Sequence, residues 1–442
     1  MVKKRIFLIG AGRSVRSFVQ YITKHAALNH WHLVIGDISL ENAQDKIIDK
    51  KTTSAIFFDV ADQEQLTIQI HQADVVVSML PASMHYPVAE KCVKLGKPLV
   101  TASYVASDVQ TLDQQAKENK ALLLMEMGLD PGIDHMSAKI EIDDILANGG
   151  RITSFKSFTG GLVAPESDTN PWNYKFTWNP RNVVLAGKGG VKFIRNAKYK
   201  YIPYHNLFKR YEPIHVDGYG AFEGYPNRDS LNYINVYGLE GIPTILRGTL
   251  RKKGFCDAWQ VLVQLGYTNE TIEIEQADQL TWRELTNSFL RYDADKRIEE
   301  KLREYLFVSD EIIEKLRWLG LFSDKKIPLS KATPAQLLQL ILEEKWVLLP
   351  EDKDMIVMQH QFEYVLEGKN RQLTSSLVLK GDDANNTSMA KTVGLPLGIA
   401  VKLILTGQIE LSGVQIPILP EIYIPVLKEL EDYGIIFSKS DK

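Results

Sequence analysis

The 442-residue sequence contains only two cysteines, Cys92 and Cys256, which lie far apart. So few thiols argue against a disulfide framework and suit a reducing cytoplasm. Strong charge of either sign is also lacking, because the formal net charge is −3. We therefore expect neither nucleic acid nor an anionic membrane surface as a partner.

Long apolar runs and metal-ligand spacings are missing as well. No run approaches the roughly twenty residues that span a bilayer. The start, residues 1–4, leads directly into a strand-like stretch, so we expect no signal peptide and a cytoplasmic location. His135, His205 and His215 have no partnered cysteine or histidine pattern, and we expect no metal. We find no internal repeat and no low-complexity tract.

The N-terminus carries a dinucleotide-binding pattern. Residues 5–9 form an apolar run with the length of a buried strand, Gly10-Ala11-Gly12 follows, and a helical stretch comes next. This order points free backbone N–H groups at a pyrophosphate. The third fingerprint position holds Val15 instead of Gly or Ala, so helix and strand must pack differently. The cofactor contacts expected here are Gly10, Gly12, Arg13, Ser14 and Val15.

A second strand, residues 32–36, ends at Asp37. A carboxylate in this place is suited to accept hydrogen bonds from the adenosine ribose and would repel a 2′-phosphate. Neither Ile38 nor Ser39 is basic. The pattern therefore predicts NAD in preference to NADP, with Asp37 and Ile38 as contacts. The alternative is that Asp37 caps the following helix.

Further strand-like segments at 55–60, 73–81, 98–104 and 121–125 alternate with helical ones. This alternation predicts an α/β fold with a Rossmann-type, doubly wound parallel sheet. Ligands bind outside the carboxyl ends of such strands. The residues expected at these ends are Asp59, Val60, Leu80, Ala102, Ser103, Tyr104 and Leu129. Tyr104 could instead be a rim aromatic that packs on a helix.

Residues 128–135 read Gly-Leu-Asp-Pro-Gly-Ile-Asp-His. Pro131 fixes its own φ and Gly132 reaches conformations closed to other residues, so the loop can bring amides and carboxylates to a ligand. An ordinary turn followed by a helix cap is the simpler interpretation. We expect contacts with the nicotinamide half of the cofactor from Leu129, Asp130, Pro131, Gly132, Ile133, Asp134, His135 and Met136.

The remaining pattern suggests three parts. Residues 1–133 form the cofactor domain, completed by helices within about 388–442. Residues 134–280 and 350–387 form an α+β substrate and dimerisation domain, with a hairpin over 355–379. The charged, helical block 281–349 is a small helical insertion.

Several long motifs resemble the saccharopine dehydrogenases of the glutamate-forming type. They occupy residues 100–104, 128–135, 160–166, 170–171, 174–178, 225–230 and 246–251. The resemblance implies oxidation of saccharopine by a nicotinamide cofactor and water to L-glutamate and 2-aminoadipate 6-semialdehyde, by a homodimer acting in lysine metabolism. An NAD preference would suit lysine breakdown.

The resemblance marks Ser103, Tyr104, Arg228 and Thr249 as substrate contacts. Because saccharopine carries three carboxylates, guanidinium groups suit it, and Arg247 is a further expected contact. Hydride can leave the carbon beside nitrogen only when that amine is neutral, so a proton must be removed. We expect Asp130 and Tyr104 to assist catalysis. Family members commonly carry a Cys where this chain has Thr159, which leaves the identity of any dedicated base open.

Two alternatives stay open, one among related enzymes and one from a different class of protein. One is an enzyme that reduces imines on a similar domain, such as carboxynorspermidine or homospermidine synthase. The arginines Arg228, Arg247 and Arg251 argue against it, because polyamines would favour acidic pocket walls. The other is a redox-sensing protein that holds NAD without turnover, which would have little reason to keep the motifs at 225–230 and 247–251.

Overall fold

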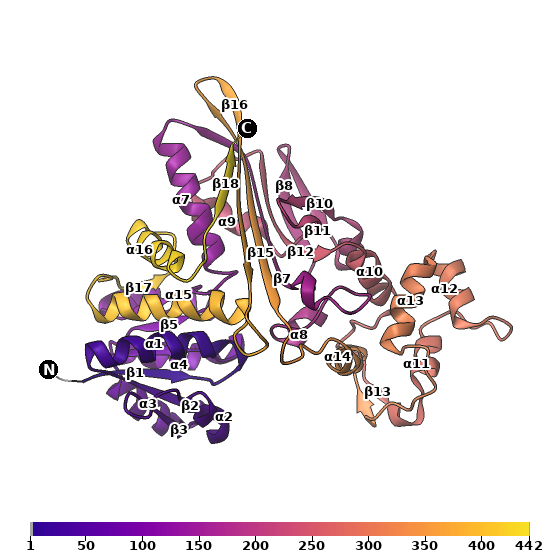
Figure 1. Cartoon of the computed structure of the whole chain (residues 1–442), viewed down its shortest axis with the longest axis horizontal. Coiled ribbons are helices and arrows are strands. Elements are labelled where there is room, and N and C mark those ends of the chain that lie inside the picture. Colours follow the sequence, from indigo (N-terminus) through magenta and orange to yellow (C-terminus); the bar gives the residue numbers. More distant parts are fainter. Residues whose placement is uncertain (1–2, 442) are drawn as a thin grey trace. The chain divides into compact units, whose positions relative to one another are not determined.

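The computed structural model describes residues 3–441, and the chain divides into two compact units (Figure 1). Unit 1 comprises Met1–Ile152 and Tyr364–Lys442, and unit 2 comprises Thr153–Glu363. Residues 134–152 and 364–387, which we expected in the substrate domain, thus lie in unit 1. The domain bounds expected from the sequence otherwise stay predictions.

Unit 1 contains a seven-stranded sheet in the order β17-β6-β5-β4-β1-β2-β3, and its paired strands are all parallel. The doubly wound parallel sheet is therefore confirmed. The order reverses between β1 and β4, and a dinucleotide binds at such a reversal in this fold. The strands are β1 (Lys4–Ile9), β2 (Trp31–Asp37), β3 (Thr53–Phe57), β4 (Val75–Ser78), β5 (Leu99–Thr101), β6 (Leu122–Leu124) and β17 (Gly413–Gln415).

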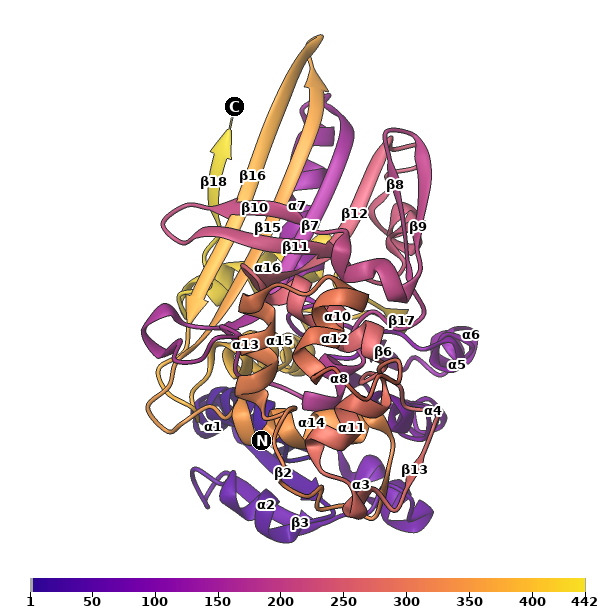
Figure 2. The ribbon, with the colours of Figure 1, turned by 90° about the vertical axis from the view of Figure 1, so that its right-hand side faces the viewer.

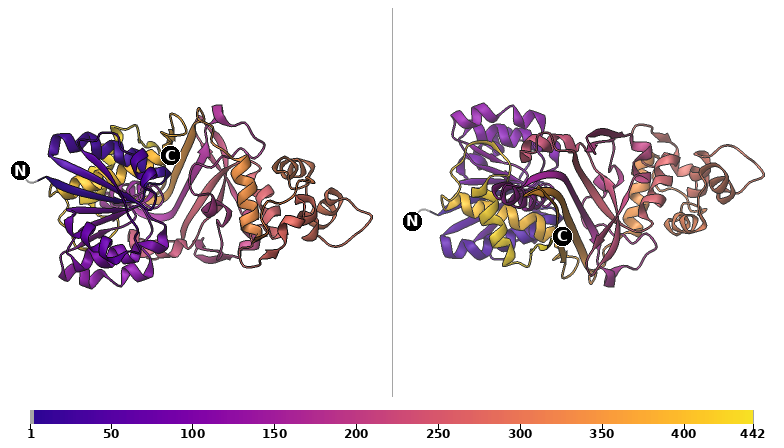
Figure 3. Two further views of the ribbon diagram at one scale, coloured as in Figure 1. Left: turned by 90° about the horizontal axis from the view of Figure 1, so that it is seen from below. Right: turned by 90° about the horizontal axis from the view of Figure 1, so that it is seen from above.

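Helices cover both faces of this sheet (Figure 3). On one face, an apolar cluster joins the sheet to α3 (Gln63–Gln72), α4 (His85–Lys94), α5 (Ser107–Gln110) and α6 (Asp113–Glu118). On the other face lie α1 (Arg16–Asn29) and α15 (Ser388–Leu405), and α15 also contacts β4 and β5. The remaining helices of unit 1 are α2 (Leu40–Asp45), α7 (Ile133–Ala147) and α16 (Pro420–Glu431). The C-terminal helices expected from the sequence are thus present.

Two glycines let α15 lie directly against α1. A Cβ at Gly394 would sit 2.6 Å from the backbone nitrogen of Phe18, and one at Gly398 would sit 2.6 Å from the ring of Tyr21. The Tyr21 hydroxyl in turn donates to Glu429 of α16 at 2.5 Å. Among the described residues, α15 is long and apolar enough to cross a membrane, yet 78% of it is buried, as in the core helix of a globular unit.

Unit 2 is built on the strand order β10-β11-β12-β7-β15, in which β12 and β7 are parallel and β10, β11 and β12 are antiparallel. A hairpin, β8 and β9, attaches to β12 (Figure 2). The strands are β7 (Arg151–Val163), β8 (Val191–Arg195), β9 (Lys198–Ile202), β10 (Glu212–Val216), β11 (Gly220–Pro226), β12 (Thr244–Lys252) and β15 (Asp354–Leu366). In unit 1, β16 (Lys369–Lys380) pairs with β18 (Ser438–Asp441).

Unit 2 has a buried aromatic cluster in addition to its sheet and helices. Trp172, Trp259 and Trp346 contact one another with ring centroids 5.5–6.4 Å apart. The helices are α8 (Pro180–Val184), α9 (Tyr233–Tyr237), α10 (Phe255–Leu265), α11 (Trp282–Ser288), α12 (Ile298–Leu306), α13 (Asp310–Leu319) and α14 (Pro334–Lys345), and a short pair, β13 (Ile274–Glu275) and β14 (Lys331–Ala332), joins them. Four of these helices fall within the block 281–349 that we expected to be helical.

We predict that alanine substitutions at the two glycines of α15 destabilise the protein to different extents. Gly394→Ala places a methyl group against immovable backbone, so we expect a loss of about 2–3 kcal/mol in the free energy of unfolding. Gly398→Ala meets a ring that can shift, and the better helix propensity of Ala offsets part of the strain, so about 1 kcal/mol or less is expected. Urea unfolding of both variants and the wild type measures the difference. Equal losses would contradict this account of the α1–α15 contact.

Candidate active site

The glycine turn after β1 lies at the reversal of strand order. Gly10 has a φ of 96°, and a Cβ there would sit 3.0 Å from the carbonyl oxygen of Met79, so the turn passes tightly beside the end of β4. At Gly12, by contrast, an added Cβ would meet nothing within 4 Å. The short helix η1 (Arg13–Val15) and then α1 begin at once. An open glycine before a helix N-terminus fits the approach of a pyrophosphate.

The other residues expected beside the cofactor lie along the same edge. Val15 is buried, and the side chain of Arg13 lies outside the described part of the chain. Val60 is buried after β3, Asp59 accepts a hydrogen bond from the backbone of Ala61 at 2.9 Å, and Leu80 is partly buried after β4. Ser14 and Ala102 are partly exposed.

Asp37 at the end of β2 is held by two backbone N–H groups. Its Oδ2 accepts from Ala11 at 2.7 Å and its Oδ1 accepts from Ser39 at 2.8 Å. The cap of α2 is Ser39, which accepts from Asn42. Asp37 therefore ties the glycine turn to the end of β2, and Ile38 beside it is 70% exposed.

Tyr104 and Asp130 meet at the carboxyl ends of β5 and β6. The Tyr104 hydroxyl donates to Asp130 Oδ1 at 2.8 Å, and both side chains are partly exposed. The two residues that the sequence marked for catalysis are thus in direct contact. A carboxylate hydrogen-bonded to a phenol can take up and pass on a proton.

The Asp-Pro-Gly loop is held in one compact turn. Gly132 has a φ of 144°, and a Cβ there would sit 2.1 Å from the carbonyl oxygen of Gly128. The N–H of Gly128 donates to Pro131 at 3.0 Å, and Asp134 Oδ1 accepts from Gly132 at 2.6 Å. Gly128 also packs on Ala102, where an added Cβ would come within 2.9 Å of the alanine side chain. The loop therefore fixes the place of Asp130 relative to β5.

Most residues that follow in this motif are buried. The side chains of Ile133, His135 and Met136 are 0% exposed, and Leu129 and Asp134 are nearly so. Because these values cover backbone and side chain together, Ile133, His135 and Met136 offer a cofactor no accessible surface, and Leu129 and Asp134 offer little. Helix α7 begins at Ile133, directly after Gly132 closes the turn.

The sequence reasoning missed two polar residues at this edge. Glu126 accepts from the backbone of Val105 at 3.0 Å and pairs with His135 Nε2 at 2.7 Å, which holds the segment that carries Tyr104. His85 lies between Ser78 and Ser103, with ring nitrogens 2.9 Å and 2.7 Å from the two hydroxyl oxygens. Neither residue belongs to a spacing pattern. Glu126 lies two residues before the motif, and that position was its only signal.

In unit 2, the predicted substrate contacts lie on and beside β12. Arg247, Thr249 and Arg251 alternate along the strand and so share one face. The register places Thr249 beside Thr159 of β7 and Tyr225 of β11. Thr159, which replaces the cysteine common in the family, thus lies next to a predicted substrate contact.

The three arginines have different surroundings. Arg228 is exposed and has a φ of 52°. Arg247 is buried, with its guanidinium carbon 4.1 Å from the ring centroid of Tyr233. Arg251 is buried among aromatic rings, 5.0 Å from Tyr174 and 5.2 Å from Phe255. Arg251 is therefore a core cation of unit 2.

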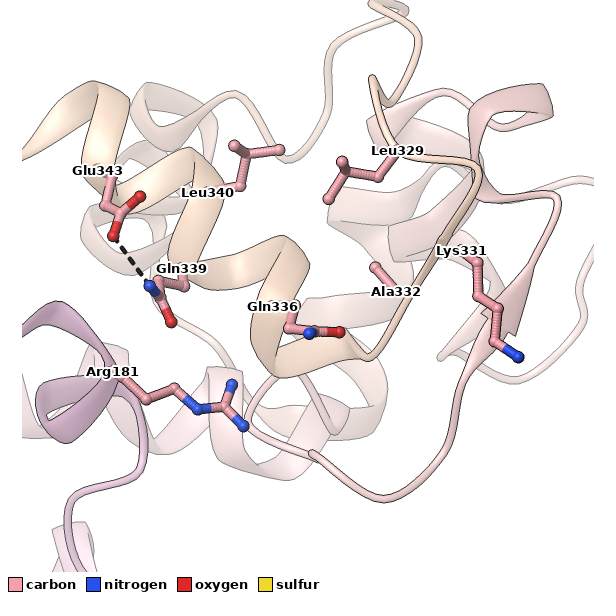
Figure 4. A pocket seen from close by; sticks show the side chains of 8 residues that line it. All are labelled: Arg181, Leu329, Lys331, Ala332, Gln336, Gln339, Leu340 and Glu343. Carbon is pink, nitrogen blue, oxygen red and sulfur yellow. Dashed lines mark hydrogen bonds between the residues drawn. The ribbon is translucent and has the colours of Figure 1, made fainter. Parts of the chain in front are cut away.

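A cavity of about 560 Å³ lies elsewhere in unit 2, between α8, α14 and β14 (Figure 4). Arg181 at its edge pairs with Glu270 at 2.7 Å, and Lys331 pairs with Glu273 and Glu275. None of the residues predicted for substrate or cofactor lines it. Within residues 3–441, no group of three or more His, Cys, Asp or Glu side chains is arranged to hold a metal.

A doubly wound sheet with a glycine turn at its reversal and polar side chains at its strand ends defines a dinucleotide-binding oxidoreductase. The chain belongs to the saccharopine dehydrogenase family. The model of the saccharopine dehydrogenase NADP binding domain matches residues 6–124, and that of the saccharopine dehydrogenase C-terminal domain matches residues 128–435.

Comparisons with individual proteins give the same family. The chain is 33% identical over 447 residues to saccharopine dehydrogenase [NADP(+), L-glutamate-forming] of Pyricularia oryzae, covering 98% of each chain. It is 33% identical to mouse mitochondrial alpha-aminoadipic semialdehyde synthase, covering 99% of this chain and 48% of that one. The apo structure of saccharopine dehydrogenase (L-Glu forming) from Saccharomyces cerevisiae matches with a TM-score of 0.90 and 31% identity, covering 99% of this chain and 100% of that one.

The expectation of NAD in preference to NADP is wrong. The matching domain is an NADP binding domain, and the fungal relatives are named for NADP(+). A preference for NAD would require Asp37 to have a carboxylate free to bind ribose and repel phosphate. In the structure, both of its oxygens accept backbone N–H groups, which partly offset the charge and give Asp37 a structural role.

Two glycines at the ends of α7 test the Asp-Pro-Gly turn. Gly132 and Gly149 both have positive φ, but an added Cβ would collide only at Gly132, because nothing lies within 4 Å at Gly149. We expect Gly149→Ala to cost about 1–2 kcal/mol of stability and Gly132→Ala more than about 4 kcal/mol. Thermal and urea unfolding measure both. A Gly132→Ala variant as stable as Gly149→Ala would show that the turn tolerates rearrangement.

Proposed function

We propose that the protein oxidises L-saccharopine with NADP⁺ and water to L-glutamate and L-2-aminoadipate 6-semialdehyde. The observation that carries the proposal is the 2.8 Å hydrogen bond from Tyr104 to Asp130 at the carboxyl ends of β5 and β6. Family membership and the names of the relatives support the substrate. The match to glutamate-forming enzymes over 98% of the chain also favours saccharopine over polyamine substrates.

Bound NADP⁺ supplies the hydride acceptor, and the glycine turn is suited to hold its pyrophosphate. We propose that Gly10, Gly12 and Ser14 contribute backbone contacts there. Asp59, Val60, Leu80 and Ala102 line the same strand ends and complete the proposed cofactor contacts. The open space at Gly12 supports this assignment.

Tyr104 and Asp130 are suited to manage the proton. The substrate is a secondary amine that is protonated at neutral pH, and it must lose this proton before hydride can leave the neighbouring carbon. We propose that Asp130 accepts the proton directly or through the hydroxyl of Tyr104. The pair can return the proton to nitrogen when water has added to the imine, so that glutamate departs as the amine.

The identity of residue 159 supports the assignment of proton transfer to Tyr104 and Asp130. Its hydroxyl cannot act as a base near neutral pH, so the chain does not rely on a thiol at this position. The Tyr104–Asp130 pair is then the proton-transfer group that the sequence and the geometry both favour.

Charge complementarity supports the substrate contacts in unit 2. A substrate with three carboxylates favours guanidinium groups, which bind carboxylates through paired hydrogen bonds. We propose that Arg228, Arg247 and Thr249 contact the substrate. Arg251 is left out of this set because aromatic rings enclose it.

The degradative direction that we expected rested on NAD and loses its support with that correction. The same groups serve both directions, because the proton that leaves the amine in oxidation is the one that must be supplied in reduction. Cytoplasmic location and a homodimer stay predictions.

The test of the proposal follows the absorbance of the reduced nicotinamide when the purified protein is mixed with saccharopine and NADP⁺, with glutamate measured as the second product. We expect reduction of NADP⁺, a much slower reaction with NAD⁺, and none when carboxynorspermidine replaces saccharopine. No reduction with saccharopine and either dinucleotide would refute the proposal.

The first prediction for catalysis concerns the Tyr104–Asp130 pair. Asp130→Asn keeps the size of the side chain and removes its charge, so we expect kcat to fall by about one to two orders of magnitude with little change in Tm. Tyr104→Phe should lower kcat to a similar extent. The control is Asp62→Asn, because Asp62 caps α3 and Asn caps equally well. If Asp130→Asn behaved like this control, Asp130 would be a turn residue only.

A second prediction concerns substrate binding. Arg228→Ala should raise KM for saccharopine by a factor of about thirty to a thousand, because a charge-assisted pair with a carboxylate is worth roughly 2–4 kcal/mol. The Kd for NADP⁺ should stay unchanged. Lys192→Ala is the matched control, since Lys192 is a neighbouring exposed cation that pairs with Asp229 at 3.5 Å. Parallel losses of substrate and cofactor binding would point to a folding role for Arg228.

A further inference from the structure

A buried histidine connects the ends of two neighbouring strands in unit 1. His85 is the first residue of α4 and is 2% exposed. Its Nδ1 lies 2.9 Å from the hydroxyl oxygen of Ser78, the last residue of β4. Its Nε2 lies 2.7 Å from the hydroxyl oxygen of Ser103, two residues beyond β5. Ser103 precedes Tyr104, so the chain of three side chains ends beside the proposed proton-transfer pair.

The histidine is neutral under ordinary conditions. Burial lowers the pKa of His85 to about 4. A neutral imidazole has one nitrogen that donates and one that accepts, so the hydrogen bonds through the ring run in a single direction. Either Ser78 donates to Nδ1 and Nε2–H donates to Ser103, or both bonds are reversed. Only the first arrangement leaves the hydroxyl proton of Ser103 available for another partner.

The backbone of Ser103 is held by hydrogen bonds of its own, so His85 can influence only the orientation of the Ser103 hydroxyl. The N–H of Ser103 donates to the hydroxyl of Thr101 at 3.3 Å, and its carbonyl accepts from the N–H of Glu126 at 3.1 Å. The orientation of the Ser103 hydroxyl group is therefore what the bond to His85 determines. Carboxylates accept hydrogen bonds and never donate them when ionised, so a ligand with carboxylates selects the arrangement in which Ser103 donates.

We propose that His85 is a positioning residue that donates from Nε2 to Ser103 and thereby directs the Ser103 hydroxyl proton toward a carboxylate of the substrate, while Ser78 sets the tautomer. This inference rests on the proposed function. Because each group donates once and accepts once, the bonds strengthen one another along the chain from Ser78 to the substrate.

Three substitutions separate this role from simple packing. His85→Phe keeps the ring and removes both nitrogens, and we expect KM for saccharopine to rise about five- to tenfold while kcat and the Kd for NADP⁺ change less than about twofold. His85→Gln places an amide N–H near the position of Nε2 and should restore most of the loss. His85→Asn reaches only as far as Nδ1 and should not. Unchanged KM in His85→Phe, or equal rescue by Asn and Gln, would overturn the proposal.

Coupling to Ser103 gives a second criterion. If His85 acts through Ser103, adding His85→Phe to Ser103→Ala should change KM by less than about twofold. Additive effects would mean that His85 acts by another route. The matched control is His32→Phe, which removes a 2.9 Å histidine–serine hydrogen bond, to Ser54, from the same sheet at β2. This variant should keep the wild-type KM.

The tautomer can be read without any turnover. In protein labelled with ¹⁵N-histidine, the signals of His85 are assigned by their loss in His85→Phe. We expect a proton on Nε2 and none on Nδ1 near neutral pH. A proton on Nδ1 would overturn the proposal, whether or not saccharopine is the substrate. A wild-type protein inactive with saccharopine but protonated at Nε2 would instead refute the proposed function and support the hydrogen-bond direction.

Discussion

The backbones of Gly128 and Gly132 lie so close that the carbonyl oxygen of one occupies the place where a side chain of the other would begin. Hydrogen bonds from Gly128 to Pro131 and from Ile133 to Gly128 close this contact, and α7 starts from it. Because Gly128 also rests on Ala102, the turn is fixed against the end of β5. Asp130 reaches Tyr104 only while this contact holds, so the chemistry proposed for unit 1 depends on two positions without side chains.

The sequence predicted the elements that local pattern determines. The apolar runs at 5–9, 32–36 and 121–125 became β1, β2 and β6 within two residues, because buried parallel strands leave this continuous signal. The sequence marked Tyr104 and Asp130 for catalysis, and both follow neighbouring strands, but the hydrogen bond between them is a finding of the structure. Residues 134–152 and 364–387 lie in unit 1, although we expected them in the substrate domain, because a local helix or strand pattern does not reveal which compact unit the element joins.

The failures share one physical cause, which is that hydrogen bonds between distant residues leave no local pattern. Asp37 has the position expected of a ribose acceptor, but Ala11, 26 residues earlier, uses one of its oxygens. His85 and Glu126 acquire their roles from Ser103 and Val105, which lie on another loop. Similarly, nothing in the spacing of the three arginines distinguishes exposed Arg228 from Arg251, which aromatic rings enclose.

The contact between α1 and α15 has a consequence for the order in which the protein folds during synthesis. Helix α1 leaves the ribosome early, but its partner begins at Ser388. At about 5–20 residues per second, roughly 20–70 s separate the two. Unit 2 is made in this interval, whereas the part of the parallel sheet that α15 covers stays open. The first unit to begin is therefore the last to finish.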